Sequence, residues 1–98
     1  MALYHVDVTV DNSVSSVAVD WFKTNAGDIS SSPGFKTLNL YQDVGDTGDS
    51  THFVIVATAD SVESVKGFIE ASASKLKGDL GQFGDKLKFK RIVAKQVL

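Results

Sequence analysis

The chain has 98 residues, enough for one domain and too few for two. Hydrophobic residues make up 43% and charged residues 22%, as in globular proteins, and a net charge of −2 argues against a nucleic-acid-binding role. There is no cysteine, which excludes disulfides, thiolate catalysis and thiolate zinc sites.

The first half of the chain predicts a strand, a helix and a second strand. Residues 3–10 alternate, with Tyr4 and three valines on one side, and this period of two is typical of a strand. Segment 11–13 supplies N-cap side chains, and apolar residues then recur at helical spacing up to Ile29. Ser-Ser-Ser-Pro-Gly at 30–34 ends this helix.

The second half predicts two further strands around a second helix. Strands are expected over 35–44 and 51–59, and the turn-rich segment 45–50 between them predicts an antiparallel hairpin. Asp60 and Glu63 resemble a capping box that starts a helix ending near Leu80, and residues 87–98 form a last strand.

This order, β-α-β-β-α-β, predicts one α+β domain over residues 1–98, a ferredoxin-like sandwich with a four-stranded antiparallel sheet. Both faces of the sheet carry apolar residues. Phe53 and Ile55 point away from Val54 and Val56 on the third strand, and on the second strand Leu38 and Leu40 oppose Phe35 and Tyr41. Two helices cover one face only, so we expect a homodimer that pairs through the other.

The sequence shows neither a signal peptide nor an apolar run long enough to cross a membrane. We therefore expect a cytoplasmic protein that does not associate with membranes.

Three segments carry a resemblance to a known group of proteins. They are His5 in the first strand, Thr51-His52-Phe53-Val54 in the third, and residues 60–65 entering the second helix. With Pro33-Gly34-Phe35, this pattern resembles the dimeric α/β-barrel superfamily, and most of all its stress-responsive A/B-barrel and olivetolic acid cyclase-like group. The antibiotic-biosynthesis monooxygenases are a looser match.

The resemblance implies a small-molecule site in which His5 and His52 lie in or beside the ligand cavity. The cyclase's essential tyrosine aligns with Phe68, which has no hydroxyl, and its histidine-rich stretch aligns with residues 70–74, which contain no histidine. The cyclase reaction is therefore not transferred. The monooxygenases often act without a cofactor, and no cofactor is expected here.

His5, Asp7 and His52 are the candidate catalytic residues. His5 and Asp7 are two apart on one strand and share a face, and a neighbouring strand brings His52 beside them. Such a cluster is suited to general acid/base chemistry, with Asp7 orienting a histidine. A hydrogen-bonded structural patch is the alternative. The spacing does not favour a metal site.

Aromatic and polar residues are candidates for ligand contacts. Trp21, Tyr41 and Phe68 are expected to shape an apolar wall, and Asn39 is expected to orient a ligand, although ordinary core packing explains the aromatic residues equally well. Basic residues gather near the C-terminus, where they protect an edge strand or attract an anionic ligand; they are Lys86, Lys88, Lys90, Arg91 and Lys95.

The sequence thus predicts a dimeric protein that binds a hydrophobic small molecule, as a binding protein or as a cofactor-free monooxygenase- or cyclase-like enzyme. The alternative is a non-catalytic, stress-related assembly or interaction module in which the polar cluster is structural.

Overall fold

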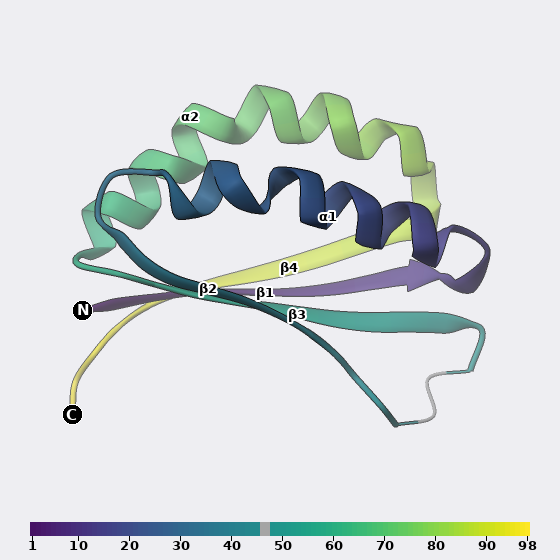
Figure 1. Cartoon of the computed structure of the whole chain (residues 1–98), viewed down its shortest axis with the longest axis horizontal. Coiled ribbons are helices and arrows are strands. Elements are labelled where there is room, and N and C mark those ends of the chain that lie inside the picture. The colour runs from purple at the N-terminus through teal and green to yellow at the C-terminus, as the bar shows by residue number, and fades with distance from the viewer. Residues whose placement is uncertain (46–47) are drawn as a thin grey trace.

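The computed structural model describes residues 1–45 and 48–98. Asp46 and Thr47, in the predicted hairpin turn, lie outside the described residues. The elements in chain order are β1 (Ala2–Asp11), η1 (Asn12–Val14), α1 (Ser15–Ser30), β2 (Phe35–Gln42), β3 (Ser50–Ala59), α2 (Val62–Leu80), η2 (Gly81–Lys86) and β4 (Leu87–Lys95) (Figure 1). Among the described residues, neither helix is both long and apolar enough to pass through a membrane.

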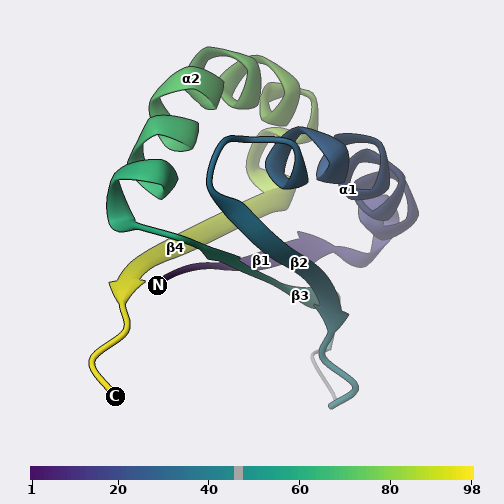
Figure 2. The same ribbon diagram turned by 60° about the vertical axis from the view of Figure 1, so that its left-hand side comes forward.

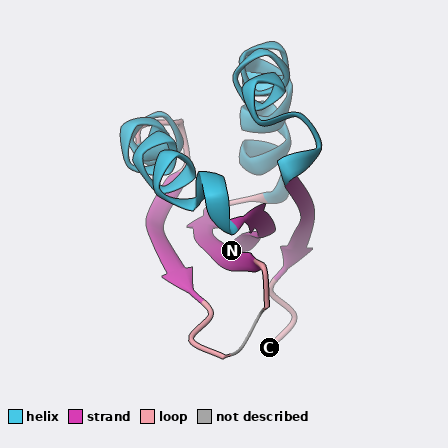
Figure 3. Cartoon of the chain, turned by 90° about the vertical axis from the view of Figure 1, so that its right-hand side faces the viewer, coloured by secondary structure: helices cyan, strands magenta, loops and turns pink. Residues whose placement is uncertain are grey.

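The four strands form one antiparallel sheet in the order β2-β3-β1-β4. Both helices lie against the same face of this sheet, and the other face carries no helix (Figures 2 and 3). The predicted ferredoxin-like α+β fold is therefore confirmed. β4 lies at an edge of the sheet, as its lysines suggested.

The central strand β1 explains where the core lies. Its even-numbered residues are buried under the helices, and its odd-numbered residues up to Asp7 are half-buried on the open face. Phe22 of α1 packs edge-to-face on Phe53 of β3, with ring centroids 5.8 Å apart. The buried core is Ala2, Tyr4, Val6, Val8, Val10, Ala18, Phe22, Phe53, Ala57, Ala59, Val65, Phe83 and Leu87.

The starts of both helices differ from the predicted caps. Asp11 accepts hydrogen bonds from the backbone N–H and hydroxyl of Ser13, which caps the 3-10 turn η1, while α1 begins after Val14 with no side-chain cap. At α2 the N-cap is Ser61, whose hydroxyl accepts from the N–H of Ser64. The predicted capping pair of Asp60 and Glu63 is therefore wrong by one residue, and Asp60 instead accepts from the Ser64 hydroxyl at 2.6 Å.

Phe35 lies on the opposite face from the one predicted. A bulge between Phe35 and Thr37 shifts the register of β2, so that Phe35 pairs with Ala59 and faces the helices. Its ring packs edge-to-face on Phe68 at 5.6 Å. The simple alternation assumed for β2 fails because the extra residue reverses which side its first residue occupies.

Gly34 is required where the chain leaves α1 and enters β2. Its φ is +87°, and an added Cβ would collide with the Ser64 hydroxyl and lie 2.6 Å from Oδ1 of Asp60. We expect Gly34→Ala to lower the free energy of unfolding by about 2 kcal/mol, because it combines left-handed backbone strain with overpacking. Urea denaturation measures this.

Gly27→Ala is the matched control, because Gly27 is helical and has no neighbour within 4 Å of an added Cβ. We expect this change to stabilise the protein by up to about 1 kcal/mol. Equal effects of the two substitutions would contradict the tight packing at Gly34.

Candidate functional site

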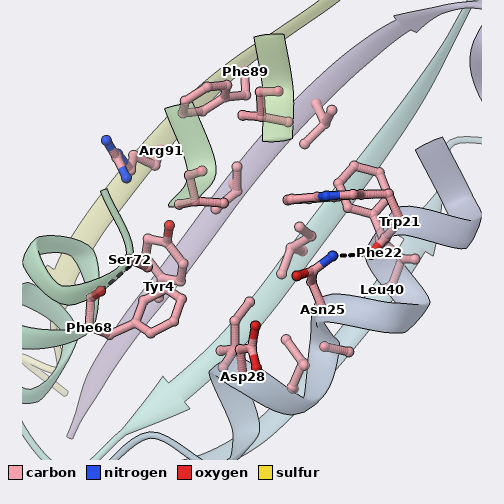
Figure 4. A pocket seen from close by; sticks show the side chains of 18 of the residues that line it. Tyr4, Trp21, Phe22, Asn25, Asp28, Leu40, Phe68, Ser72, Phe89 and Arg91 are labelled. Carbon is pink, nitrogen blue, oxygen red and sulfur yellow. Dashed lines mark hydrogen bonds between the residues drawn. The ribbon is translucent and has the colours of Figure 1, made fainter. Parts of the chain in front are cut away.

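A cavity of about 230 Å³ lies between the two helices and the sheet. All four strands and both helices contribute to its wall, which is mainly apolar (Figure 4). The lining residues are Tyr4, Val6, Val8, Trp21, Phe22, Lys23, Asn25, Ala26, Asp28, Ile29, Leu38, Leu40, Ile55, Phe68, Ser72, Lys75, Leu76, Leu80, Leu87, Phe89 and Arg91.

Polar side chains bridge the two helices beside this cavity. Nζ of Lys75 on α2 donates to Oδ2 of Asp28 at 2.5 Å and to Oδ1 of Asn25 at 2.8 Å, both on α1. Nε1 of Trp21 donates to Oδ2 of Asp79 at 3.3 Å. The hydrogen bond to Asp28 raises the pKa of the Lys75 ammonium group. These bridges hold together two helices that make little backbone contact with each other.

Tyr4 places a hydroxyl group in the cavity. Its side chain is 4% exposed, lines the cavity and packs against the Phe68 ring at 5.9 Å. Among the described residues its hydroxyl makes no hydrogen bond, and no unpaired side-chain oxygen or nitrogen is completely sealed from solvent. The hydroxyl is therefore reachable through the cavity, where it is available to a ligand.

The two histidines meet on the open face of the sheet, away from the helices. Nε2 of His5 lies 3.0 Å from Oδ1 of Asp7, and Nε2 of His52 lies 3.5 Å from the same oxygen. Nδ1 of His52 lies 3.5 Å from Oδ2 of Asp43. These four side chains, the histidine-aspartate row, run diagonally from β1 across β3 to the end of β2.

The hydrogen bond from His5 is the main reason that the pKa of Asp7 lies below its ordinary value. The pKa of Asp43 is also lowered, first by the backbone N–H of Gly45 and then by His52. Among the described residues, no group of three or more histidine, cysteine or acidic side chains is placed to hold a metal ion.

The structure divides the predicted site residues between the two faces of the sheet. It brings His5, Asp7 and His52 together, and the strand register puts Asn39 and Tyr41 on the same open face. Trp21 and Phe68 lie on the other face and line the cavity, as Figure 4 shows. The sheet therefore separates the predicted acid/base residues from the aromatic residues expected to share their site.

Sequence reasoning overlooked Tyr4 and the bridging residues as site residues. Alternation assigned Tyr4 to the core, and only its unpaired hydroxyl distinguishes it from a phenylalanine. Lys75 and Asp28 are 47 positions apart, so no local motif links them.

The contribution of Asp7 to the stability of the fold depends on pH. Because its pKa is below 3.8 in the folded protein, its pairing stabilises the fold above pH 4, and this contribution is lost as the pH falls through the lowered value. We expect the difference in urea midpoint between the wild type and Asp7→Asn to shrink between pH 5 and pH 3. Asp20→Asn, an exposed carboxylate on α1, is the control. A difference that does not change with pH would contradict the pairing.

Solved structures with the same fold include several described as antibiotic biosynthesis monooxygenases. A candidate antibiotic biosynthesis monooxygenase from Nitrosomonas europaea matches with a TM-score of 0.78 and 15% identity over 100% of both chains. A variant of SnoaB, a cofactor-independent oxygenase from Streptomyces nogalater, matches at 0.73 and 10% identity, covering 99% of this chain and 94% of its own. A variant of MhuD with two manganese protoporphyrin IX molecules bound per active site matches at 0.70 and 17%, covering 100% and 96%.

These likenesses confirm the predicted group of ferredoxin-like folds and, at such low identity, concern the fold alone. A search of curated proteins finds no sequence relative. One family model matches residues 1–97. The chain therefore belongs to the family described as a domain of unknown function (DUF4286).

Proposed function

We propose that this protein binds a small, apolar, ring-containing molecule in the cavity between its helices and its sheet. The observation that carries this proposal is a partly open cavity of about 230 Å³ between the helices and the sheet. Since a cavity of about 150 Å³ takes benzene, a molecule of one or two rings fits here.

The lining suits a flat ligand. Trp21 on α1 and Phe68 on α2 offer aromatic surfaces from opposite helices, and Ile55 and Val6 come from the central strands. Tyr4 adds one hydrogen-bonding group in an otherwise apolar region. An apolar pocket with a few directed polar groups is the usual form of a small-molecule site.

Binding is favoured over catalysis by the side chains that line the cavity. Both histidines lie on the opposite face of the sheet. The one lining carboxylate in the described chain, Asp28, is paired with Lys75. A cofactor-free oxygenase or cyclase needs a base next to its substrate, or a substrate acidic enough to ionise unaided. The fold shared with the SnoaB oxygenase does not supply that base.

We further propose that the open sheet face is the surface of a homodimer. Val54 and Val56 stand at its centre, Ile92 and Tyr41 are 45% and 55% exposed, and this face has no helix to cover it. Pairing would bury the histidine-aspartate row at the seam. We infer that His5, Asp7 and His52 serve there as a satisfied polar network rather than as acid/base catalysts.

Filling the cavity tests the binding proposal. We expect Ile55→Phe to weaken binding of 1-naphthalenemethanol at least about tenfold without unfolding the protein, because the larger ring occupies ligand space. Calorimetry measures the affinity, and the emission of Trp21, the only tryptophan, reports on the cavity itself.

Two further variants complete this test. Val17→Ala, at a 51% exposed position on α1, serves as the neutral control. His52→Ala examines the open face. If Ile55→Phe binds 1-naphthalenemethanol normally and His52→Ala does not bind it, the ligand site lies on the open face and the proposal is refuted.

A charge placed on the open face tests the dimer. We expect the wild type to be dimeric at micromolar concentration in light scattering and Val56→Asp to be monomeric, because burying an unpaired carboxylate at the seam is costly. Val17→Asp adds the same charge to an exposed helix position and should stay dimeric. A monomeric wild type would contradict the proposed interface.

A further inference from the structure

The hydrogen-bonding groups left over in the cavity wall can all donate a hydrogen bond. Lys75 donates to both Asn25 and Asp28, and the Ser72 hydroxyl donates to the Phe68 carbonyl at 2.7 Å. Among the described residues, the lining side chains with no hydrogen bond or ion pair to the protein are the Tyr4 hydroxyl, the Arg91 guanidinium and the Lys23 ammonium group. A ligand with acceptor atoms can therefore bond to all three groups, since Arg91 and Lys23 only donate and the Tyr4 hydroxyl can donate.

The charge of the side chains that line the cavity also bears on the chemistry of the ligand. Lys23, Lys75 and Arg91 face a single carboxylate, Asp28, so the cavity is lined by an excess of positive charge. The chain as a whole has a net charge of −2. A cationic lining in an acidic protein favours an anionic ligand over a neutral or cationic one.

Tyr4 and Arg91 are neighbours on one side of the cavity. Tyr4 on β1 pairs with Val93 on β4, and Arg91 pairs with Val6, so Tyr4 and Arg91 are diagonal neighbours on the helix-covered side of the sheet. Diagonal Cα atoms lie about 7–8 Å apart, within reach of aromatic and long side chains. Figure 4 shows both on the same side of the cavity. The Arg91 guanidinium lies 5.5 Å from the centre of the Phe89 ring, which helps to hold it at this edge.

We propose that the ligand is a small aromatic carboxylate, a deduction that rests on the binding function proposed above. Its ring lies between Trp21 and Phe68, and its carboxylate accepts hydrogen bonds from the Arg91 guanidinium and the Tyr4 hydroxyl. A guanidinium binds a carboxylate through two parallel N–H groups, which fixes the orientation of the ring.

Two probes of matched shape test this assignment by calorimetry. We expect 1-naphthoate to bind about tenfold more tightly than the neutral 1-naphthalenemethanol, a modest factor because Arg91 is exposed and water screens its charge. Arg91→Gln should abolish this preference and leave the affinity for the alcohol unchanged.

Lys90→Gln is the matched control, since it removes a charge from the adjacent residue of β4, which pairs with Asp7 and faces the other side of the sheet. Lys90→Gln should still bind 1-naphthoate more tightly than 1-naphthalenemethanol. Tyr4→Phe should weaken 1-naphthoate severalfold while the urea midpoint stays the same, because the hydroxyl it removes makes no hydrogen bond within the described chain.

The possible failures are distinguishable. Equal affinity for the two probes, or a preference that survives Arg91→Gln, would overturn the carboxylate assignment while leaving the cavity as a binding site. Binding of neither probe, or binding that is insensitive to Ile55→Phe, would overturn the binding function itself.

Discussion

Two helices have to cover one face of a four-stranded sheet, and in this chain they do so without packing closely against each other. Figure 3 shows the two helices apart above the sheet. They make little backbone contact with each other, and Lys75 of α2 bonds to Asp28 of α1 across the gap. The space left between them is the cavity of about 230 Å³. This gap is the feature from which a function can be argued.

The two faces of the sheet carry different chemistry because strand residues alternate. On the helix-covered face, β1 presents Tyr4, Val6 and Val8 to an apolar space with donor groups at its edge. On the open face, the same strand presents His5 and Asp7, which bond to each other. A group that acts on a ligand between the helices must therefore come from the first set, and a group that acts at an interface between copies must come from the second. This separation leads us to assign binding to one face and assembly to the other.

Much of the fold could be predicted because period-two and helical patterns depend on local residues alone. The meeting of His5, Asp7 and His52 was also predictable, since strand pairing follows from the order of elements. The position of the cavity relative to that cluster was not. Both faces carry apolar residues, so the pattern does not reveal which one the helices leave partly unfilled. Phe35 shows a second limit, because a one-residue bulge reverses its face without leaving a signature in the sequence.

The central claim is that ligands enter between the helices and not on the open face. Nuclear magnetic resonance can test it directly, because the chain has one tryptophan, lining the cavity, and two histidines, both on the open face. On titration with 1-naphthoate, the indole N–H of Trp21 should shift in a saturable manner while the imidazole signals of His5 and His52 stay in place. Saturable shifts of the imidazole signals with an unchanged indole signal would contradict the account.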